Sequence, residues 1–409
     1  MTSETYPALG LLAALIVLSQ LHALLFFSAR IKIPALRKLL RAVYLLFNLS
    51  GFSAFLAFQA LELPGDGGLI RNYLYLPGIV WQSVHLVWIV PGLVLSALTA
   101  LVSLLLSARE PKGLPKLFRA KKNEPSLAHP AGLLLCAFLI LGFHSYLNEL
   151  KGPEINETVL AYPDLPRELE GFTLALISDV HYGRGSSLTG LEEALERVKR
   201  AAPEVVFLAG DISDCPAKYA SELAKPLSTL KNTPFGVYAV LGDRDLKKDG
   251  NPQLLNALRS AGVIPAGGRR IMVHGLPLTV MGFQDLPGEV PDLFPLDFLG
   301  REFVLDFASL KGPPPPLGNF NVIFSHRPPA ISNSPSGGSL YLSGHARGGH
   351  FALPGDKDLN LAALFYDRSS GLYQSGSAYI LVSRGISDSF FHLRFFARPE
   401  INIVRLTRG

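Results

Sequence analysis

Hydrophobic patterning divides this chain of 409 residues into two parts. Apolar residues are concentrated before Glu149, where four long runs contain no Asp, Glu, Lys or Arg. Each run approaches, reaches or exceeds the roughly 20 residues that a helix needs to cross a bilayer. The runs cover residues 8–27, 42–60, 79–106 and 131–147. We therefore predict an all-α region of four transmembrane helices within residues 1–150.

Basic residues flank these runs unevenly, and this asymmetry predicts a topology. The loop after the first run holds five Lys or Arg between residues 30 and 41, and the loop after the third holds six between residues 109 and 122. The loop after the second run holds only Arg71. Because positively charged loops stay in the cytoplasm, we expect the domain after residue 150 on the outer, periplasmic or extracellular, face of a bacterial membrane.

The pattern changes after residue 150. Residues 151–171 are rich in Pro and Glu and are predicted to form a linker and a first strand. From Thr173, apolar strands alternate with helical stretches near residues 191–200, 219–230 and 253–260, which is typical of βαβ units around a parallel core. After residue 270 short strands dominate. This composition predicts an α/β domain over residues 172–409, with two packed mixed sheets and helices outside them.

Candidate metal ligands follow five of the predicted strands. Buried strands read as apolar runs, and ligands at their carboxyl ends converge on one edge of a sheet. Carboxylates and imidazoles gathered in this way suit dications such as Mn²⁺, Zn²⁺ or Fe²⁺. Asp179 and His181 follow TLALIS, Asp211 follows VVFLAG, Asp243 follows VYAVLG, His326 follows FNVIFS, and His345 follows SLYLSG.

The order of these motifs resembles the calcineurin-like metallophosphoesterase superfamily. The matching segments are Asp179-x-His181, Gly210-Asp211, Gly242-Asp243-Arg244-Asp245, His326 and Gly344-His345-Ala346-Arg347. The segment GHARGGHFALP and the tail with VSRG and RPE are most similar to the membrane-anchored bacterial branch of that superfamily. The resemblance implies a four-layer α-β-β-α sandwich, here preceded by the four-helix transmembrane region.

The resemblance also assigns roles to these residues. Asp211 would bridge two dications, Asp179 and His181 would hold the first, and Asp243, His326 and His345 would hold the second. The cations would lower the pKa of a shared water molecule, which attacks the phosphorus in line with the leaving group. The implied cofactor is a divalent metal, Mn²⁺ or alternatively Zn²⁺ or Fe²⁺, with one or two ions bound.

Three residues depart from the family pattern. Asp243 stands where Asn is usual, Arg244 where His is usual, and Arg347 where the last His would bind the first metal. Arginine cannot be deprotonated in a protein and cannot bind a cation. One dication together with Arg347 would balance the three carboxylates, so we hypothesise one firm metal site and one that is weak or absent. His350 is a candidate substitute ligand, and the sequence leaves open whether Arg347 points into the site.

Arginine side chains are also the candidates for substrate binding. The segment around Arg244 is similar to the G-N-R-D motif of the UDP-2,3-diacylglucosamine hydrolases, where the arginine faces phosphate. We therefore expect Arg244 to act in catalysis beside Asp211. Arg327 and Arg347 are further candidates for contact with the phosphate, since a planar guanidinium group suits a pair of phosphate oxygens.

Together these features predict a membrane-anchored, metal-dependent phosphoesterase that cleaves phosphodiester or pyrophosphate bonds of a lipid-linked or nucleotide-sugar-lipid substrate. The UDP-2,3-diacylglucosamine hydrolases act on a lipid precursor in the cytoplasm, whereas the positive loops predict that this domain lies outside the cell membrane. The two expectations therefore disagree about the substrate. The expected partners are the bilayer and the phosphoester. No nucleic acid is expected, because eleven of the 38 basic residues lie in the two positive loops.

Two alternatives remain open. Arg347 favours a degenerate member with one metal or none, kept as a binding or structural module. The helices could instead form a channel or transporter with an appended domain, although the absence of charged residues from the four runs counts against ion conduction.

Overall fold

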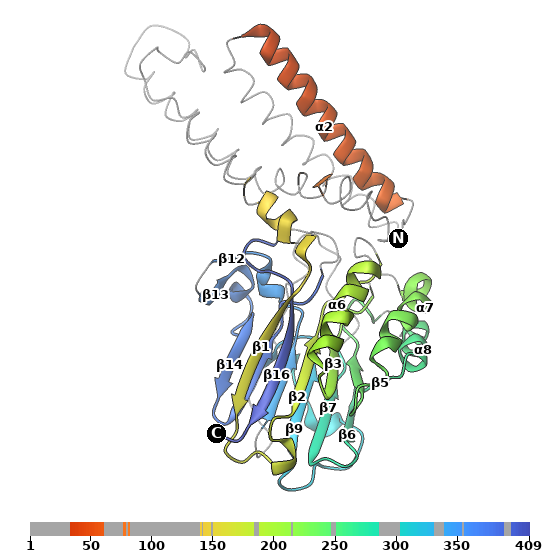
Figure 1. Ribbon diagram of the computed structural model, residues 1–409, viewed down its shortest axis with the longest axis vertical. Helices are drawn as coiled ribbons and strands as arrows, with labels where there is room; N and C mark the ends of the chain where they lie inside the picture. Colours follow the sequence, from red (N-terminus) through yellow and green to blue (C-terminus); the bar gives the residue numbers. More distant parts are fainter. Residues whose placement is uncertain are drawn as a thin grey trace, which may run out of the picture. The chain divides into compact units, whose positions relative to one another are not determined.

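The computed structural model describes most of the chain after residue 150 and a smaller share before it (Figure 1). The described residues are 33–60, 77–78, 81, 140, 142–148, 150–183, 188–213, 216–246, 251–285, 303–330, 339–353, 356–387 and 394–409. The chain separates into two compact units, of which the second includes everything from Leu147 to Gly409. Each unit is therefore considered by itself.

Helix α2 (Pro34–Ala60) is the main described element of the first unit, and it contains the apolar run 42–60. Among the described residues, no helix combines the length and the apolarity needed to cross a membrane. The runs 8–27 and 79–106 lie outside the described residues apart from residue 81, and the run 131–147 is described only at 140 and from 142 onward. The four-helix transmembrane region therefore stays a prediction.

The second unit contains a six-stranded mixed sheet in the order β1-β16-β2-β3-β4-β5. Strands β2 to β5 run parallel, whereas β16 is antiparallel to β2 and parallel to β1. The strands are β1 (Glu154–Ala161), β2 (Thr173–Ile177), β3 (Val205–Ala209), β4 (Val237–Val240), β5 (Val263–Pro265) and β16 (Glu400–Thr407). The segment expected to be a linker and a first strand thus supplies an edge strand of this sheet.

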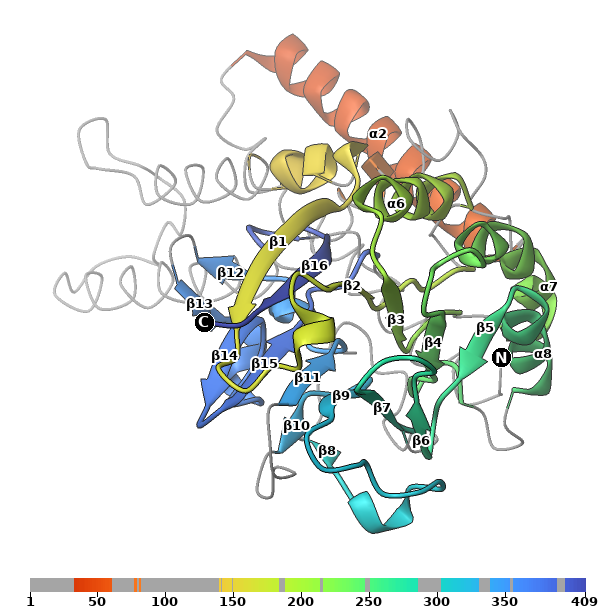
Figure 2. The ribbon, with the colours of Figure 1, turned by 60° about the horizontal axis from the view of Figure 1, so that its bottom comes forward.

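Three helices cover one face of this first sheet, and all three were predicted from the sequence (Figures 1 and 2). They are α6 (Leu188–Ala201), α7 (Pro216–Leu227) and α8 (Pro252–Ser260). Helix α8 begins where Asn251 accepts the backbone N–H of Leu254 at 3.1 Å and Pro252 occupies the first turn, where a missing N–H costs nothing.

A second six-stranded mixed sheet packs on the first, in the order β14-β15-β11-β9-β7-β6 (Figure 2). Its strands are β6 (Arg269–Met272), β7 (Leu278–Phe283), β9 (Phe320–Ser325), β11 (Ser339–Ser343), β14 (Gly371–Ser375) and β15 (Ala378–Val382). Two short pairs lie outside it: β8 (Phe303–Val304) with β10 (Pro329–Ala330), and β12 (Ala352–Leu353) with β13 (Asp356–Asn360).

Alternating side chains of the central strands form the core between the sheets. Leu174 and Leu176 of β2 belong to the cluster shared by the two sheets, whereas Ala175 and Ile177 belong to the cluster beneath the helices. The rings of Phe207 and Phe324, from opposite sheets, meet edge to face with centroids 5.1 Å apart. Both faces of the first sheet are therefore buried, which explains its continuous apolar runs.

The outer face of the second sheet differs from the expected helical fourth layer. In the part of the chain that the structure describes, it is packed by 3-10 helices instead of α-helices: η4 (Phe307–Ser309) and η6 (Leu361–Leu364) contribute Phe307, Leu361 and Ala362 to a third core cluster. The remaining 3-10 turns are η2 (Arg167–Leu169), η3 (Ser228–Leu230) and η5 (Arg347–Gly349). The described domain is thus an α/β sandwich of two mixed sheets with helices on one side.

Candidate metal centre

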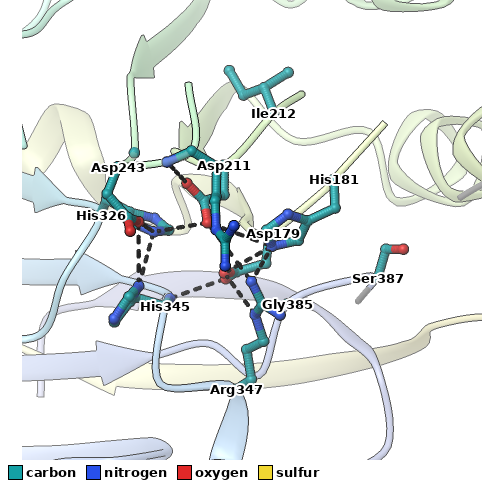
Figure 3. Close-up of polar contacts among 12 residues, drawn as sticks. Asp179, His181, Asp211, Ile212, Asp243, His326, His345, Arg347, Gly385 and Ser387 are labelled. Atoms are coloured by element: carbon teal, nitrogen blue, oxygen red, sulfur yellow. Dashed lines mark hydrogen bonds and ion pairs between the residues drawn. The ribbon is translucent and has the colours of Figure 1, made fainter. Parts of the chain in front are cut away.

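The five strands predicted to deliver metal ligands all end at one edge of the sandwich. Strands β2, β3 and β4 come from the first sheet, and β9 and β11 from the second. The side chains that follow them point toward one another (Figure 3). They fall into two clusters that share Asp211: a first cluster of Asp179, His181 and Asp211, and a second cluster of Asp211, Asp243, His326 and His345.

The second cluster has the dimensions of a tetrahedral cation site. His326 Nε2 lies 3.1 Å from His345 Nδ1 and 3.3 Å from one oxygen each of Asp211 and Asp243. His345 Nδ1 lies 3.6 Å from the same Asp243 oxygen. Ligand atoms about 2.1 Å from a common ion stand about 3.4 Å apart at tetrahedral angles. The four side chains, whose ligand atoms all lie within 4.8 Å of one another, could therefore hold a dication between them.

The surroundings of the two histidines support this fit. His326 Nδ1 lies 2.8 Å from the carbonyl oxygen of Ala209, to which it donates in the tautomer that leaves Nε2 as a ligand atom. His345 Nε2 is buried and has no hydrogen-bond partner among the described residues. Two imidazole nitrogens facing each other within a group of carboxylates form an arrangement that a cation would stabilise.

Backbone strain is concentrated at this site. Asp179, His181, Asp211 and His345 have positive φ values of 52°, 46°, 51° and 65°. This left-handed conformation is unfavourable for residues with a side chain and persists only where the surroundings enforce it. Glycine supplies the space: a Cβ on Gly385 would lie 2.6 Å from the Cβ of Asp179, and one on Gly242 would lie 2.6 Å from the backbone nitrogen of Asp211.

Asp245 holds the two loops that carry Asp211 and Asp243. It is fully buried and accepts the backbone N–H groups of Ile212, Ser213 and Gly242 at 2.9 to 3.0 Å. Burial, together with the charge of Asp211, raises the pKa of Asp245 to about 7. The sequence marked Asp245 as part of a motif but gave it no role, because its partners are backbone groups of distant segments.

Arg347 lies inside the first cluster (Figure 3). Its side chain is 1% exposed. Its Nε donates to Asp179 at 3.2 Å, its terminal nitrogen forms a hydrogen bond with His181 Nε2, and the same terminal nitrogen is 3.7 Å from Asp211. The question that the sequence left open is therefore answered: Arg347 points into the site and contacts every member of the first cluster.

Charge interactions within the two clusters shift their pKa values. Burial raises the pKa of Asp179, but His181 and Arg347 outweigh this effect and hold it well below the usual range. Burial lowers the pKa of His345 to about 4, although the Asp243 carboxylate opposes the change. Burial also favours neutral His326, yet Asp211 and Asp243 raise its pKa well above 6.5. The carboxylates therefore attract a proton in the place that a cation would take.

The remaining sequence candidates have more specific surroundings than expected. The backbone N–H of Arg244 bonds to Asp211 at 3.0 Å. Burial raises the pKa of Asp243, but His326, His345 and the Arg244 side chain outweigh this effect and lower it. Arg327 forms an ion pair with the buried Asp285 at 3.1 Å. His350 is buried but belongs to neither group of possible ligand atoms among the described residues.

The VSRG and RPE segments contact each other beneath the site. Glu400 accepts the backbone N–H of Arg384 at 3.0 Å and its Nε at 2.8 Å. The backbone N–H groups of Ile386 and Ser387 bond to the carbonyl oxygens of Ser178 and Asp179. These contacts place Gly385 directly under Asp179, so the tail supports the ligand loop, a function that the sequence alone did not indicate.

Known proteins are similar to more than half of this chain. The uncharacterized metallophosphoesterase YkuE of Bacillus subtilis is 27% identical over 260 residues, covering 62% of this chain and 85% of the relative. Phosphodiesterase YaeI of Escherichia coli is 24% identical over 253 residues, covering 58% and 82%. A transmembrane protein with metallophosphoesterase domain from Danio rerio is 26% identical over 284 residues, covering 66% of this chain and 62% of that protein.

No family model matches the chain. At the level of the superfamily, the chain is a distant relative of the calcineurin-like metallophosphoesterases.

Proposed function

We propose that this chain is a metal-dependent phosphoesterase that uses water to hydrolyse phosphodiester or pyrophosphate bonds. The observation that carries the proposal is the second cluster, whose two imidazoles and two carboxylates have ligand atoms within 4.8 Å of one another at the ends of strands from both sheets. The distant relatives support the same class, since their names include metallophosphoesterase and phosphodiesterase.

The residues of the site would have different roles in such a reaction. A dication held by the second cluster would polarise a phosphoryl oxygen and lower the pKa of a water molecule. Asp211 and Asp243 supply the negative charge that retains it, and the contact of His326 with Ala209 fixes its Nε2 toward the same point. Arg244 extends from the loop that carries Asp243 and is the candidate for binding a phosphate oxygen pair.

The proposed substrates are membrane-derived phosphoesters, either lipid-linked or nucleotide-sugar-lipid. The apolar runs before Glu149 and the name of the Danio rerio relative support an anchored enzyme. The similarity around Arg244 to the UDP-2,3-diacylglucosamine hydrolases supports a pyrophosphate or phosphodiester group. The positive loops favour a domain on the outer face of the membrane, where that cytoplasmic lipid precursor is not found, so the proposal includes other phospholipids and sugar lipids.

Hydrolysis of an aryl phosphodiester by the purified full chain tests the proposal. We expect turnover with Mn²⁺, none with a chelator, and loss by at least about 100-fold in Asp211→Ala, because the shared ligand is removed. Glu157→Ala, on an exposed position of β1, is the matched control and retains activity. Turnover that persists in Asp211→Ala or in the chelator contradicts the proposal.

A second candidate function is a degenerate binding module. The specific observation in its favour is Arg347, which fills the first cluster of an otherwise hydrolytic arrangement. This candidate predicts that the full chain binds a phosphodiester or Mn²⁺ without converting any substrate. The same assay separates the two, because a hydrolase releases product in proportion to time.

A further inference from the structure

The first cluster is directly occupied by the guanidinium group of Arg347. Its donors reach an oxygen of Asp179 at 3.2 Å, an oxygen of Asp211 at 3.7 Å, and the Nε2 atom of His181. These three acceptors are the atoms that the first cluster offers to a metal. A cation bound to them would stand about 2.0–2.2 Å from each, within the space that the guanidinium nitrogens take.

The lone pair of His181 is decisive. A neutral imidazole binds a metal through an unprotonated nitrogen, and in His181 this nitrogen accepts a hydrogen bond from Arg347. The guanidinium group never loses its charge, so it cannot leave by deprotonation when a cation arrives. A second dication would also face a full positive charge in a site that is 1% exposed or less.

The balance of charge supports the same conclusion. Asp179, Asp211 and Asp243 carry three negative charges when ionised, and all three lie at the two clusters. One dication in the second cluster and the Arg347 guanidinium supply three positive charges. Buried charges are stable only when they are compensated, and among the residues of the two clusters and Arg347 this combination leaves no excess of either sign.

From these contacts we infer that the centre holds one dication, in the second cluster, and that the guanidinium group of Arg347 takes the place of the other cation. Asp211 then bridges an arginine and a metal, with one oxygen 3.7 Å from Arg347 and 3.3 Å from His326. Asp179 and His181 become positioning residues for Arg347. The inference rests on the proposed function only in taking the second cluster to bind a metal.

The test is the metal content of the full chain after equilibrium dialysis against Mn²⁺, measured by elemental analysis. We expect one Mn²⁺ per chain in the wild type and in His181→Ala, and none in His326→Ala at the same free concentration. Arg347→His, which restores the ligand type usual at this position, is expected to bind two. Arg347→Lys keeps the positive charge and is the matched control, with one.

The electron paramagnetic resonance of bound Mn²⁺ gives an independent readout. A single ion produces an isolated hyperfine pattern, and Arg347→His is expected to show the spectrum of a coupled pair. Two Mn²⁺ in the wild type, or loss of the metal in His181→Ala while thermal unfolding shows it folded, overturns the inference. If Arg347→His does not fold, the comparison of His181→Ala with His326→Ala decides.

Failure of this inference is distinguishable from failure of the proposed function. Two bound ions with hydrolysis would overturn the single-metal centre and leave the phosphoesterase in place. One bound ion without hydrolysis of any phosphoester would overturn the proposed function and leave the single-metal centre in place.

Discussion

At the scale of the residue, Asp245 determines whether the two ligand loops keep their places. Its carboxylate accepts three buried backbone N–H groups, from Ile212, Ser213 and Gly242. In Asp245→Asn an amide with a single oxygen would leave at least one of these donors unsatisfied and direct an NH₂ group at another. We expect the free energy of unfolding to fall by about 2–4 kcal/mol, measured by chemical denaturation.

Asp306→Asn is the matched control for this prediction. Asp306 also accepts a backbone N–H, that of Ala308 at 3.0 Å, but at an exposed 3-10 turn. We expect a loss below about 1 kcal/mol there. Equal losses in the two variants would show that the contacts of Asp245 are no more important than those of a surface turn.

His326 links metal binding to pH. Its Nε2 lies 3.3 Å from two carboxylates, and its pKa is raised well above 6.5, so the residue is protonated at pH 6.5 without metal. A cation must displace this proton, whereas His345, with a pKa of about 4, is already neutral. Apparent Mn²⁺ affinity should therefore rise about tenfold per pH unit below the pKa of His326.

Calorimetric titration in buffers with different ionisation heats checks this linkage. We expect at least one proton released per Mn²⁺ bound near pH 6.5, and we expect the affinity to stop rising once the pH exceeds the pKa of His326. An affinity that does not change between pH 6 and pH 8 would contradict the assignment of His326 as a ligand.

The identities of the candidate ligands could be predicted from the sequence, but the direction of one side chain could not. The candidate ligands and their order were readable because each followed an apolar run, and the structure brings these six residues together in two clusters. The direction of Arg347 was not readable. It depends on the left-handed backbone at Arg347, with φ of 49°, and on acceptors supplied by Asp179 and His181 from another sheet.

At the level of elements, the local sequence pattern predicted the strands but not which strands pair with each other. Strands β2, β3, β4, β9 and β11 were visible as apolar runs, because both faces of each are buried. The C-terminal strand was visible as INIVRL, but its insertion between β1 and β2 was not. Strand pairing over more than 200 residues depends on tertiary packing, which leaves no local signal in the sequence.

The ion pair between Arg384 and Glu400 fastens this inserted strand to the site. The side chain of Glu400 is 2% exposed and accepts Arg384 Nε at 2.8 Å. In Glu400→Gln the neutral amide leaves the positive charge of Arg384 only partly compensated, and we expect a loss of about 2–4 kcal/mol in unfolding free energy. Denaturant titration measures it, and Mn²⁺ content at saturation should not change, because neither residue is a ligand.

Arg398→Ala is the control at the same scale. Arg398 pairs with Glu154 at 3.1 Å, but both side chains are about one-third exposed. Solvent screens such a pair, so its loss should cost less than about 1 kcal/mol. A cost in Arg398→Ala as large as that in Glu400→Gln would mean that burial does not set the strength of this network.

At the scale of the whole molecule, the sequence predicted a sandwich of two mixed sheets, and the described residues form one. The prediction of a helical fourth layer was not based on any particular segment of the sequence. It was taken from the fold of the family that the sequence resembles. Among the described residues, the outer face of the second sheet is packed by 3-10 turns that bring Phe307 and Ala362 to its surface. Short turns of this kind have no periodic pattern, so no reading of apolar spacing would have identified them.

The candidate metal centre has residues from both sheets, and this gives a prediction for the domain as a whole. Asp211 and Asp243 extend from the first sheet, and His326 and His345 from the second. A site that includes all four side chains exists only in the folded state, so a cation bound there stabilises that state by mass action. At 100 times its dissociation constant, Mn²⁺ should add about 2.7 kcal/mol to the free energy of unfolding.

Thermal and denaturant unfolding of the full chain, with Mn²⁺ and with a chelator, measure this effect. Because His326 is a ligand of the single proposed ion, His326→Ala should unfold at the same midpoint in both conditions. His181→Ala should keep the full stabilisation by Mn²⁺, because its partner is Arg347 instead of the metal. If the unfolding midpoint of the wild-type chain is the same with Mn²⁺ and with the chelator, no cation joins the sheets. If the midpoint of His181→Ala is also the same in both conditions while that of the wild type is not, the first cluster binds the metal.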